Sequence, residues 1–119
     1  MNNHRILVAF DGSEESFRAL EQAADVAMRR DAQVGIVTVL PPLVDAPRDA
    51  LRYLRDHGLE ATVHVPVGDP ATEIARVADD GSYHTVYLGT RDSEIEGALD
   101  PSVARAVADT SPTNVFIAR

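Results

Sequence analysis

Two loops carry the residues that could do chemistry. Asp11-Gly12-Ser13 ends an apolar run near the start of the chain, and residues 87–103 follow another apolar run, contain Gly89 and Gly97, and lead into a predicted helix. A strand, a glycine-bearing loop and a helix N-terminus bring free backbone N–H groups and the positive end of the helix dipole together. The pattern therefore predicts a site for an anion, and a phosphate group is the natural candidate.

Other kinds of chemistry are excluded or disfavoured by the residue types present. The chain has no cysteine and no lysine, which removes thiol catalysis, cysteine-ligated metals, a Schiff base, a Walker-type phosphate lysine and the lysine of a receiver domain. The histidines lie in different predicted segments without an i, i+4 pair, so we expect no metal site; they are His4, His57, His64 and His84. No G-x-S-x-G nucleophile motif is present, and we do not expect an enzyme.

The composition indicates one small acidic domain. The chain has 119 residues, of which 45% are hydrophobic, so we expect a single core and a single domain over residues 1–119. The net charge of −8 repels nucleic acid, and no basic cluster is larger than Arg29-Arg30. There is no run of about 18 apolar residues, so we expect no membrane partner and a cytoplasmic location.

The hydrophobic pattern predicts strands that alternate with helices. Apolar or alternating runs predict strands at residues 5–10, 34–40, 61–67, 85–88 and 114–118. Capping residues and helical spacing predict helices that start after Ser13, near Pro47, at Asp69-Pro70 and at Asp100-Pro101. This order implies a parallel sheet with right-handed crossovers and helices on both faces. Such sheets bind ligands beyond the carboxyl ends of their strands, where both loops lie.

Several short motifs, taken in order, point to a known family. They are I-L-V-A-F-D-G-S-E-E-S at the first strand, V-T-V-L at the second, V-G-D-P-A-T-E-I before the third helix and L-G-T-R-D near the end. In this order and at these spacings the chain resembles the universal stress protein family over essentially its full length. The resemblance implies a Rossmann-like three-layer α/β sandwich with four helices and five parallel strands in order 3-2-1-4-5. It also implies a homodimer of either an ATP-binding or a non-binding subtype.

The resemblance also implies which residues would form a nucleotide site. The family pattern is G-x-x-G, about nine residues, then G-[S/T], and Gly89 matches its first glycine. Asp11 matches a ribose position, but Asp-Gly-Ser after a strand is also ordinary turn chemistry. Arg91 either contacts phosphate or only solvates the loop. Ser102 is a ligand contact, a phosphorylation site or an ordinary first-turn serine. The full set implied by the resemblance is Ala9, Asp11, Val39, Leu88, Gly89, Arg91, Ser102 and Val103.

The chain departs from the family pattern at the phosphate end of that site. Asp92 replaces the second glycine and Pro101 the third, and the interval before Ser102 is one residue short. Asp92 brings a negative charge, Pro101 removes an N–H donor, and Asp100 is placed to cap the helix as a built-in anion. We therefore expect a degenerate adenine-nucleotide site in a stress-response binding module with no firm cofactor. The alternative is a working ATP or AMP sensor, with Mg²⁺ and slow hydrolysis.

The last predicted strand indicates how two copies would associate. In the order 3-2-1-4-5, residues 114–118 form a sheet edge, yet Val115, Phe116 and Ile117 are apolar on both faces. Exposed apolar edges invite strand pairing, so a natural protein should cover this one. A two-fold homodimer that pairs the two final strands would do so.

Overall fold

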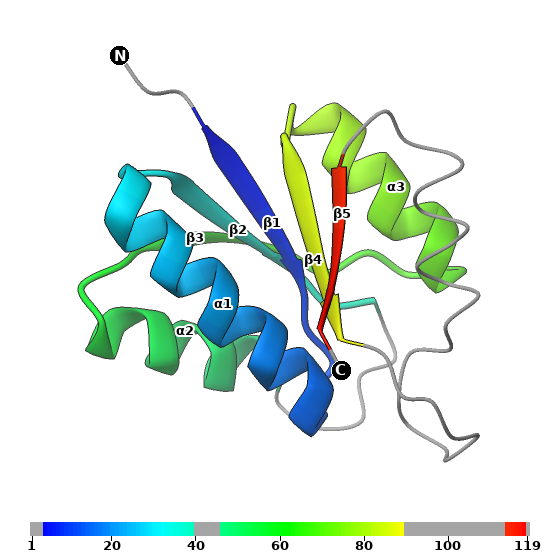
Figure 1. Cartoon of the computed structure of the whole chain (residues 1–119). Coiled ribbons are helices and arrows are strands. Elements are labelled where there is room, and N and C mark those ends of the chain that lie inside the picture. Colours follow the sequence, from blue (N-terminus) through cyan, green and yellow to red (C-terminus); the bar gives the residue numbers. More distant parts are fainter. Residues whose placement is uncertain (1–3, 40–45, 90–113, 119) are drawn as a thin grey trace.

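The computed structural model describes residues 4–39, 46–89 and 114–118. The chain alternates between strands and helices in the predicted order (Figure 1). The elements are β1 (Arg5–Ala9), α1 (Glu14–Arg30), β2 (Gln33–Val37), α2 (Ala46–Asp56), β3 (Ala61–His64), α3 (Pro70–Asp80), β4 (Thr85–Gly89) and β5 (Asn114–Ala118). The predicted fourth helix and the residues around Asp100-Pro101 lie outside the described residues.

The five strands form one parallel sheet with the order β3-β2-β1-β4-β5, which confirms the predicted fold class. β1 is central, with Val8 opposite Ile36 of β2 on one side and Tyr87 of β4 on the other. Its apolar run needs this position, because a strand covered on both faces cannot alternate between apolar and polar residues. The order reverses between β1 and β4, which places the ligand-binding end of such a sheet beside Asp11.

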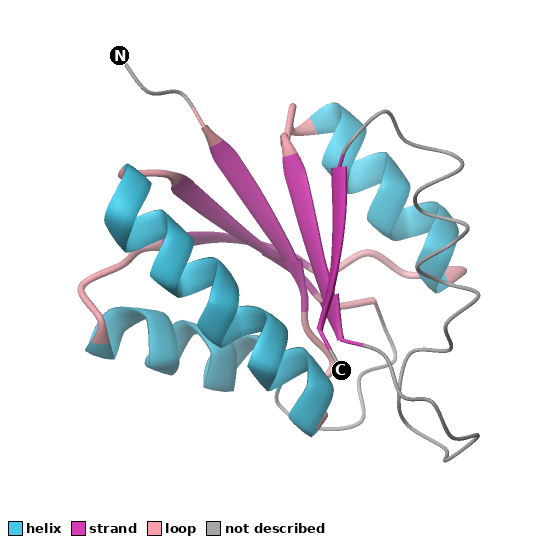
Figure 2. Cartoon of the chain, in the orientation of Figure 1, coloured by secondary structure: helices cyan, strands magenta, loops and turns pink. Residues whose placement is uncertain are grey.

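Helices cover both faces of the sheet (Figure 2). On one face α1 and α2 pack on a core that includes Val8, Leu20 and Leu54. On the other, α3 packs on a core that includes Leu7, Ile74 and Leu88. The buried side of α1 is mostly alanine, at positions 19, 23, 24 and 27, and these small side chains let the helix backbone approach the sheet closely.

Local signals start and stop the helices where the sequence predicts. Ser13 caps α1 by accepting a hydrogen bond from the Ser16 N–H at 3.2 Å. Asp69 caps α3 in the same way, with Pro70 as the first helical residue and Gly81 at the end. The described helices include none that is long and apolar enough to cross a membrane.

β1 ends one residue earlier than predicted, at Ala9, and two other strands end three residues earlier. β2 ends at Val37 and β3 at His64, whereas the hydrophobic pattern extends them to residues 40 and 67. Val65 and Val67 are 48% and 73% exposed, so the strand predicted over residues 61–67 does not continue through them. The inward side chain at this point is His64, which is partly buried and bonded to Tyr83.

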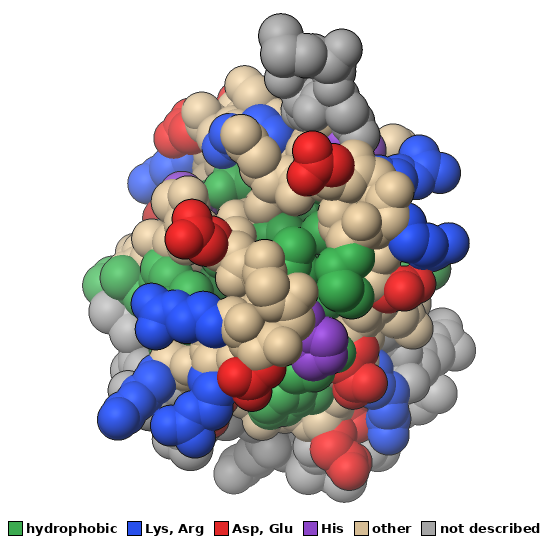
Figure 3. Space-filling view, turned by 90° about the vertical axis from the view of Figure 1, so that its left-hand side faces the viewer, with side chains coloured by type: hydrophobic (Ala, Val, Ile, Leu, Met, Phe, Trp, Pro, Cys, Tyr) green, Lys and Arg blue, Asp and Glu red, His purple; other side chains and the backbone are tan. Residues whose placement is uncertain are grey.

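The surface mixes charges of both signs. Figure 3 shows the face at the left of Figure 1, where arginine and carboxylate side chains are interspersed and apolar side chains reach the surface between them. Three arginines of α2, Arg48, Arg52 and Arg55, are exposed, with Asp49 and Asp56 on the same helix. Among the described residues, basic and acidic side chains are thus mixed on the surface, which disfavours binding of nucleic acid.

Candidate functional site

The turn after β1 holds Asp11 at the point where the strand order reverses. The Ser13 N–H donates to Asp11 Oδ1 at 2.9 Å, and Gly12 between them has a φ of 90°, which favours glycine. Ser16 Oγ lies 3.4 Å from the Asp11 N–H and donates to the Ser13 carbonyl at 2.9 Å. Asp11 is half-buried, and Oδ1 accepts the hydrogen bond of this turn. Its carboxylate is therefore held by the turn beside the reversal point, where it could accept a hydrogen bond from a ligand hydroxyl group.

Hydrogen bonds also fix the carboxyl ends of the neighbouring strands. The Phe10 N–H donates to the Val37 carbonyl at 3.0 Å, and Thr38 Oγ1 donates to the Phe10 carbonyl at 2.8 Å. Thr38 is 2% exposed, so its hydroxyl works as a buried link between β1 and β2. Val39 follows directly, half-buried against the core under α3. Asp11 and Val39, which both belong to the site implied by the resemblance, therefore follow linked ends of adjacent strands.

Ala9 and Leu88 lie opposite each other in the register of β1 and β4. They are 2% and 0% exposed, so their side chains belong to the core beneath the strand ends. A ligand beyond these ends would meet them through the backbone more readily than through the side chains.

Gly89 packs against the first turn of α1. A Cβ atom built at this position would lie 2.1 Å from the backbone carbon of Glu15 and 2.4 Å from the nitrogen of Ser16. Real Cβ atoms do not approach backbone this closely, so the position requires glycine in this packing. The first glycine of the loop pattern thus has a structural function that involves no phosphate.

The N-terminus of α1 already carries negative charge. Glu14 and Glu15 occupy its first turn, where the helix dipole favours carboxylates. Glu15 is 9% exposed, and Arg18 Nη1 lies 4.0 Å from its Oε1. A phosphate placed against this turn would meet a buried carboxylate, which weakens this helix end as an anion site.

The remaining site residues implied by the resemblance lie outside the described residues. They are Arg91, Ser102 and Val103, together with the departures Asp92, Asp100 and Pro101. In the described part of the chain, no group of three or more histidine, aspartate or glutamate side chains could hold a metal ion.

Sequence reasoning missed two contacts that shape this end of the sheet. A threonine after a strand is common, so nothing in the sequence indicates the buried hydrogen bond from Thr38 to the Phe10 carbonyl. The contact between Gly89 and Glu15 joins distant parts of the chain. Only the three-dimensional packing identifies these pairs.

Comparison with known proteins gives consistent results. The model of the universal stress protein family matches residues 2–56 and 45–119, nearly the whole chain. No curated protein matches the chain. Among solved structures, a universal stress protein from Archaeoglobus fulgidus is 25% identical, with 100% of each chain covered and a TM-score of 0.80.

Two further solved structures contain nucleotides. A universal stress protein in complex with cAMP is 27% identical over 98% of this chain and 97% of that one, with a TM-score of 0.75. A universal stress protein from Archaeoglobus fulgidus in complex with dAMP is 26% identical over 100% of both chains, also with a TM-score of 0.75. The family match spans the chain, and the sheet has the strand order that the resemblance implies. The protein therefore belongs to the universal stress protein family.

Proposed function

We propose that this chain is a homodimeric, cytoplasmic stress-response binding module rather than an enzyme, with an adenine-nucleotide site whose phosphate end is degenerate. The proposal divides the site into two halves. The nucleoside half consists of Asp11 and Val39 at the linked ends of β1 and β2. The phosphate half consists of the residues that follow β4 and the helix predicted to begin at Asp100-Pro101, which lie outside the described residues.

The nucleoside half has the groups that an adenosine needs. Asp11 offers a carboxylate to the ribose hydroxyls, and its position is set by the hydrogen bond from Ser13. Val39 provides a half-buried apolar surface next to Thr38. The relatives in complex with cAMP and dAMP support an adenine nucleotide as the class of ligand.

The observation that carries the proposal is the contact between Gly89 and the first turn of α1. This glycine meets protein backbone, so its presence does not indicate phosphate binding. The buried Glu15 beside it adds negative charge. The sequence then adds Asp92 and Asp100 where a phosphate-binding loop keeps glycine and free N–H groups.

The alternative is a working ATP or AMP sensor with Mg²⁺ and slow hydrolysis. It is favoured by the retained Asp11 and by the two nucleotide-bound relatives. The two hypotheses differ in one measurable property, which is how much the phosphate groups contribute to the affinity for the nucleotide.

Thermal unfolding with a series of ligands separates the two readings. We expect adenosine, AMP and Mg-ATP to raise the Tm by similar small amounts at equal concentration. A ligand at 100 times its Kd would add about 2.7 kcal/mol of stability, so true ATP binding is readily seen. A Tm increase that appears at micromolar Mg-ATP and not with adenosine would establish the sensor and refute the degenerate site.

Two variants make the comparison sharper. Asp92→Gly combined with Pro101→Gly restores the two missing glycines of the family pattern, although the interval between them stays one residue short. This double variant should give Mg-ATP an advantage over adenosine that the parent chain lacks. Asp11→Ala removes the ribose acceptor and should abolish the response to adenosine. A double variant that still gives ATP no advantage over adenosine would show that these two positions do not close the phosphate end.

The proposed dimer forms through β5, which is hydrogen-bonded to β4 on one side. Phe116 and Ile117 are 50% and 45% exposed, while Val115 packs against the core under α3. The Phe116 ring lies 5.0 Å from the ring of Tyr87 on β4, which is buried in the core beneath it. Burial raises the pKa of the Tyr87 phenol, so it stays uncharged beside this surface. A second copy pairing along β5 would cover both the backbone edge and these side chains.

A further inference from the structure

The Tyr83 ring occupies a space that exists because two residues around it are glycine. A Cβ at Gly35 of β2 would lie 2.1 Å from Tyr83 Oη, and a Cβ at Gly81 after α3 would lie 2.4 Å from Cε2. The ring is 5% exposed and belongs to the core under α3. It thus lies across β2, with its hydroxyl directed toward β3.

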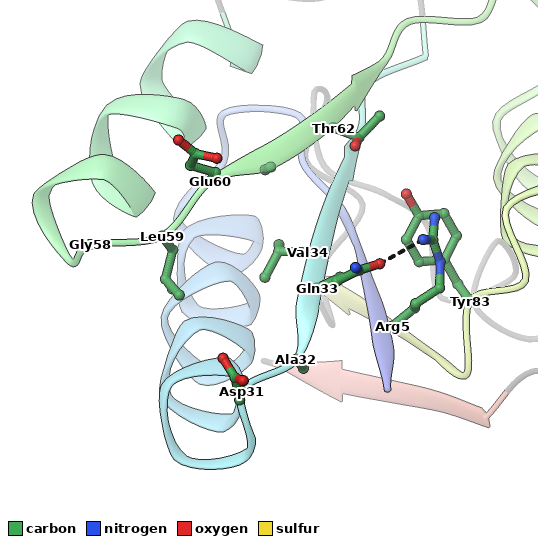
Figure 4. A pocket seen from close by; sticks show the side chains of 11 residues that line it. Arg5, Asp31, Ala32, Gln33, Val34, Gly58, Leu59, Glu60, Thr62 and Tyr83 are labelled. Carbon is green, nitrogen blue, oxygen red and sulfur yellow. Dashed lines mark hydrogen bonds between the residues drawn. The ribbon is translucent and has the colours of Figure 1, made fainter. Parts of the chain in front are cut away.

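The Tyr83 side chain joins three strands. Its hydroxyl lies 2.9 Å from His64 Nε2 at the end of β3, and the two rings meet edge to face. The Arg5 guanidinium of β1 lies over the ring, with Cζ 4.8 Å from the centroid. Arg5 Nη1 donates to Gln33 Oε1 of β2 at 2.7 Å (Figure 4). Arg5, Gln33 and Tyr83 border a hollow of about 590 Å³ at the amino ends of β2 and β3.

The hydrogen bonds that link Arg5, Tyr83 and His64 all have the same direction, from donor to acceptor. Arg5 can only donate, and it hydrogen-bonds the Tyr83 side chain. Burial raises the pKa of Tyr83, so its hydroxyl keeps a proton to donate onward to His64 Nε2. Burial, followed by the charge of Arg5, lowers the pKa of His64. Neutral His64 with its proton on Nδ1 is therefore the form whose Nε2 accepts this hydrogen bond.

Protonation turns His64 from a hydrogen-bond acceptor into a donor. An imidazolium ion has two donors and no acceptor, so the Tyr83 hydroxyl proton loses its partner in a buried place. The hydroxyl would then lie between two cations, Arg5 and His64. We propose that the Arg5–Tyr83–His64 chain is an acid-sensitive latch that holds the carboxyl end of β3 on the sheet.

The end of β3 has few other attachments. β3 is an edge strand of four residues, and the His64 carbonyl accepts the hydrogen bond of the Thr38 N–H at 3.0 Å. Val65 and Val67, which follow, are largely exposed and add little apolar burial. Release of the His64 side chain therefore leaves the Thr38–His64 backbone bond as the first one to open.

Among the described groups, Arg5 is the charged residue that shifts the pKa of His64. On α3, which packs on this face, buried Glu73 is paired with Arg76 at 3.2 Å. At the start of β4, His84 Nδ1 accepts the Arg5 backbone N–H at 3.1 Å. Neither α3 nor β4 supplies a carboxylate that stabilises protonated His64.

The direction of the pH effect follows from linkage. In the opened state His64 has its ordinary pKa of about 6.5, and in the latched state its pKa is lower. The opened state therefore binds more protons, so the latch is at full strength above pH 6.5 and weakens as the pH falls. The equilibrium constant for closing the latch falls by at most about tenfold for each pH unit. This fall ends at the pKa that His64 has in the latched state.

Amide hydrogen exchange of Thr38 in the full chain measures this opening directly. We expect its protection factor, corrected for the intrinsic exchange rate, to fall between pH 6.5 and pH 5.5 by up to about tenfold. His64→Gln keeps an acceptor for Tyr83 but cannot titrate, so its protection factor should not change with pH. His57→Gln is the matched control on an exposed histidine and should behave as the parent chain does.

Two results would overturn the latch. One is a Thr38 protection factor that is equal at both pH values, or that falls as far in His64→Gln as in the parent. The other comes from an NMR titration of His64, which needs no variant: a midpoint at or above 6.5 would contradict the chain of donors. Tyr83→Phe keeps the ring and removes the hydroxyl, and the midpoint of His64 should then rise.

Discussion

Replacement of Gly89 by alanine tests what this glycine does. The added Cβ would lie 2.1 Å from the Glu15 carbonyl carbon, 2.2 Å from its oxygen and 2.4 Å from Ser16 N. An ordinary contact between carbon atoms is about 3.5–4.0 Å. The first turn of α1 must therefore retreat by more than about 1 Å. All three atoms are backbone, so no side chain can rotate away to relieve the overlap.

The cost follows from this geometry. Overpacking a core typically costs about 1–3 kcal/mol, and the need to move backbone places Gly89→Ala near about 3 kcal/mol. For 119 residues, an unfolding entropy of about 2.1 cal/mol/K per residue gives about 0.25 kcal/mol/K. The expected fall in Tm is therefore about 12 °C.

Thermal unfolding by circular dichroism, without nucleotide and at equal protein concentration, measures this fall. Gly58→Ala is the control: nothing lies within 4 Å of its added Cβ, but its φ of +75° is unfavourable for alanine. That variant should lose about 1–2 kcal/mol from backbone strain alone. A Gly89→Ala protein that melts with the parent and loses only affinity for nucleotide would refute the packing argument.

Three other substitutions test the dimer edge, the buried hydroxyl and a helix cap. Phe116→Glu should give monomer in light scattering because it charges the proposed β5 interface. Val65→Glu is the control, because Val65 is similarly exposed but directly follows β3 at the opposite edge of the sheet, and it should leave the dimer intact. An unchanged dimer in Phe116→Glu would exclude this interface. Thr38→Val should lower the free energy of unfolding in urea by about 1–3 kcal/mol because it leaves the buried Phe10 carbonyl without its 2.8 Å partner. Asp69→Ala removes a carboxylate that accepts two hydrogen bonds in the first turn of α3, and should cost about 1 kcal/mol in the same assay; no loss would mean that solvent replaces the cap.

The fold could be predicted because its signals are local. Ser13 and Asp69 cap their helices through residues three positions later, so their effect can be read from the sequence around them. The apolar run of β1 indicates a strand buried on both faces, and its central place follows. Because each strand is followed by a helix, the strands are expected to pair in parallel.

The end of β3 could not be predicted, because a distant residue decides it. Alternation of apolar and polar residues continues through Val65 and Val67, and nothing nearby marks His64 as the inward side chain. Its orientation depends on Tyr83, nineteen positions later. The turn at Asp11 can be predicted from the local sequence Asp-Gly-Ser. The contact that requires glycine at position 89 is made with Glu15 on a different element, so the local sequence does not reveal it.

The space around Tyr83 has a consequence for how this chain can vary among its relatives. A side chain at position 35 and a large ring at position 83 exclude each other, because the added Cβ would fall within 2.1 Å of the ring's hydroxyl. The two positions should therefore co-vary, with glycine at 35 accompanying an aromatic residue at 83. Where a relative has lost the hydroxyl at 83, position 64 no longer needs an imidazole, and histidine there should give way to ordinary strand residues.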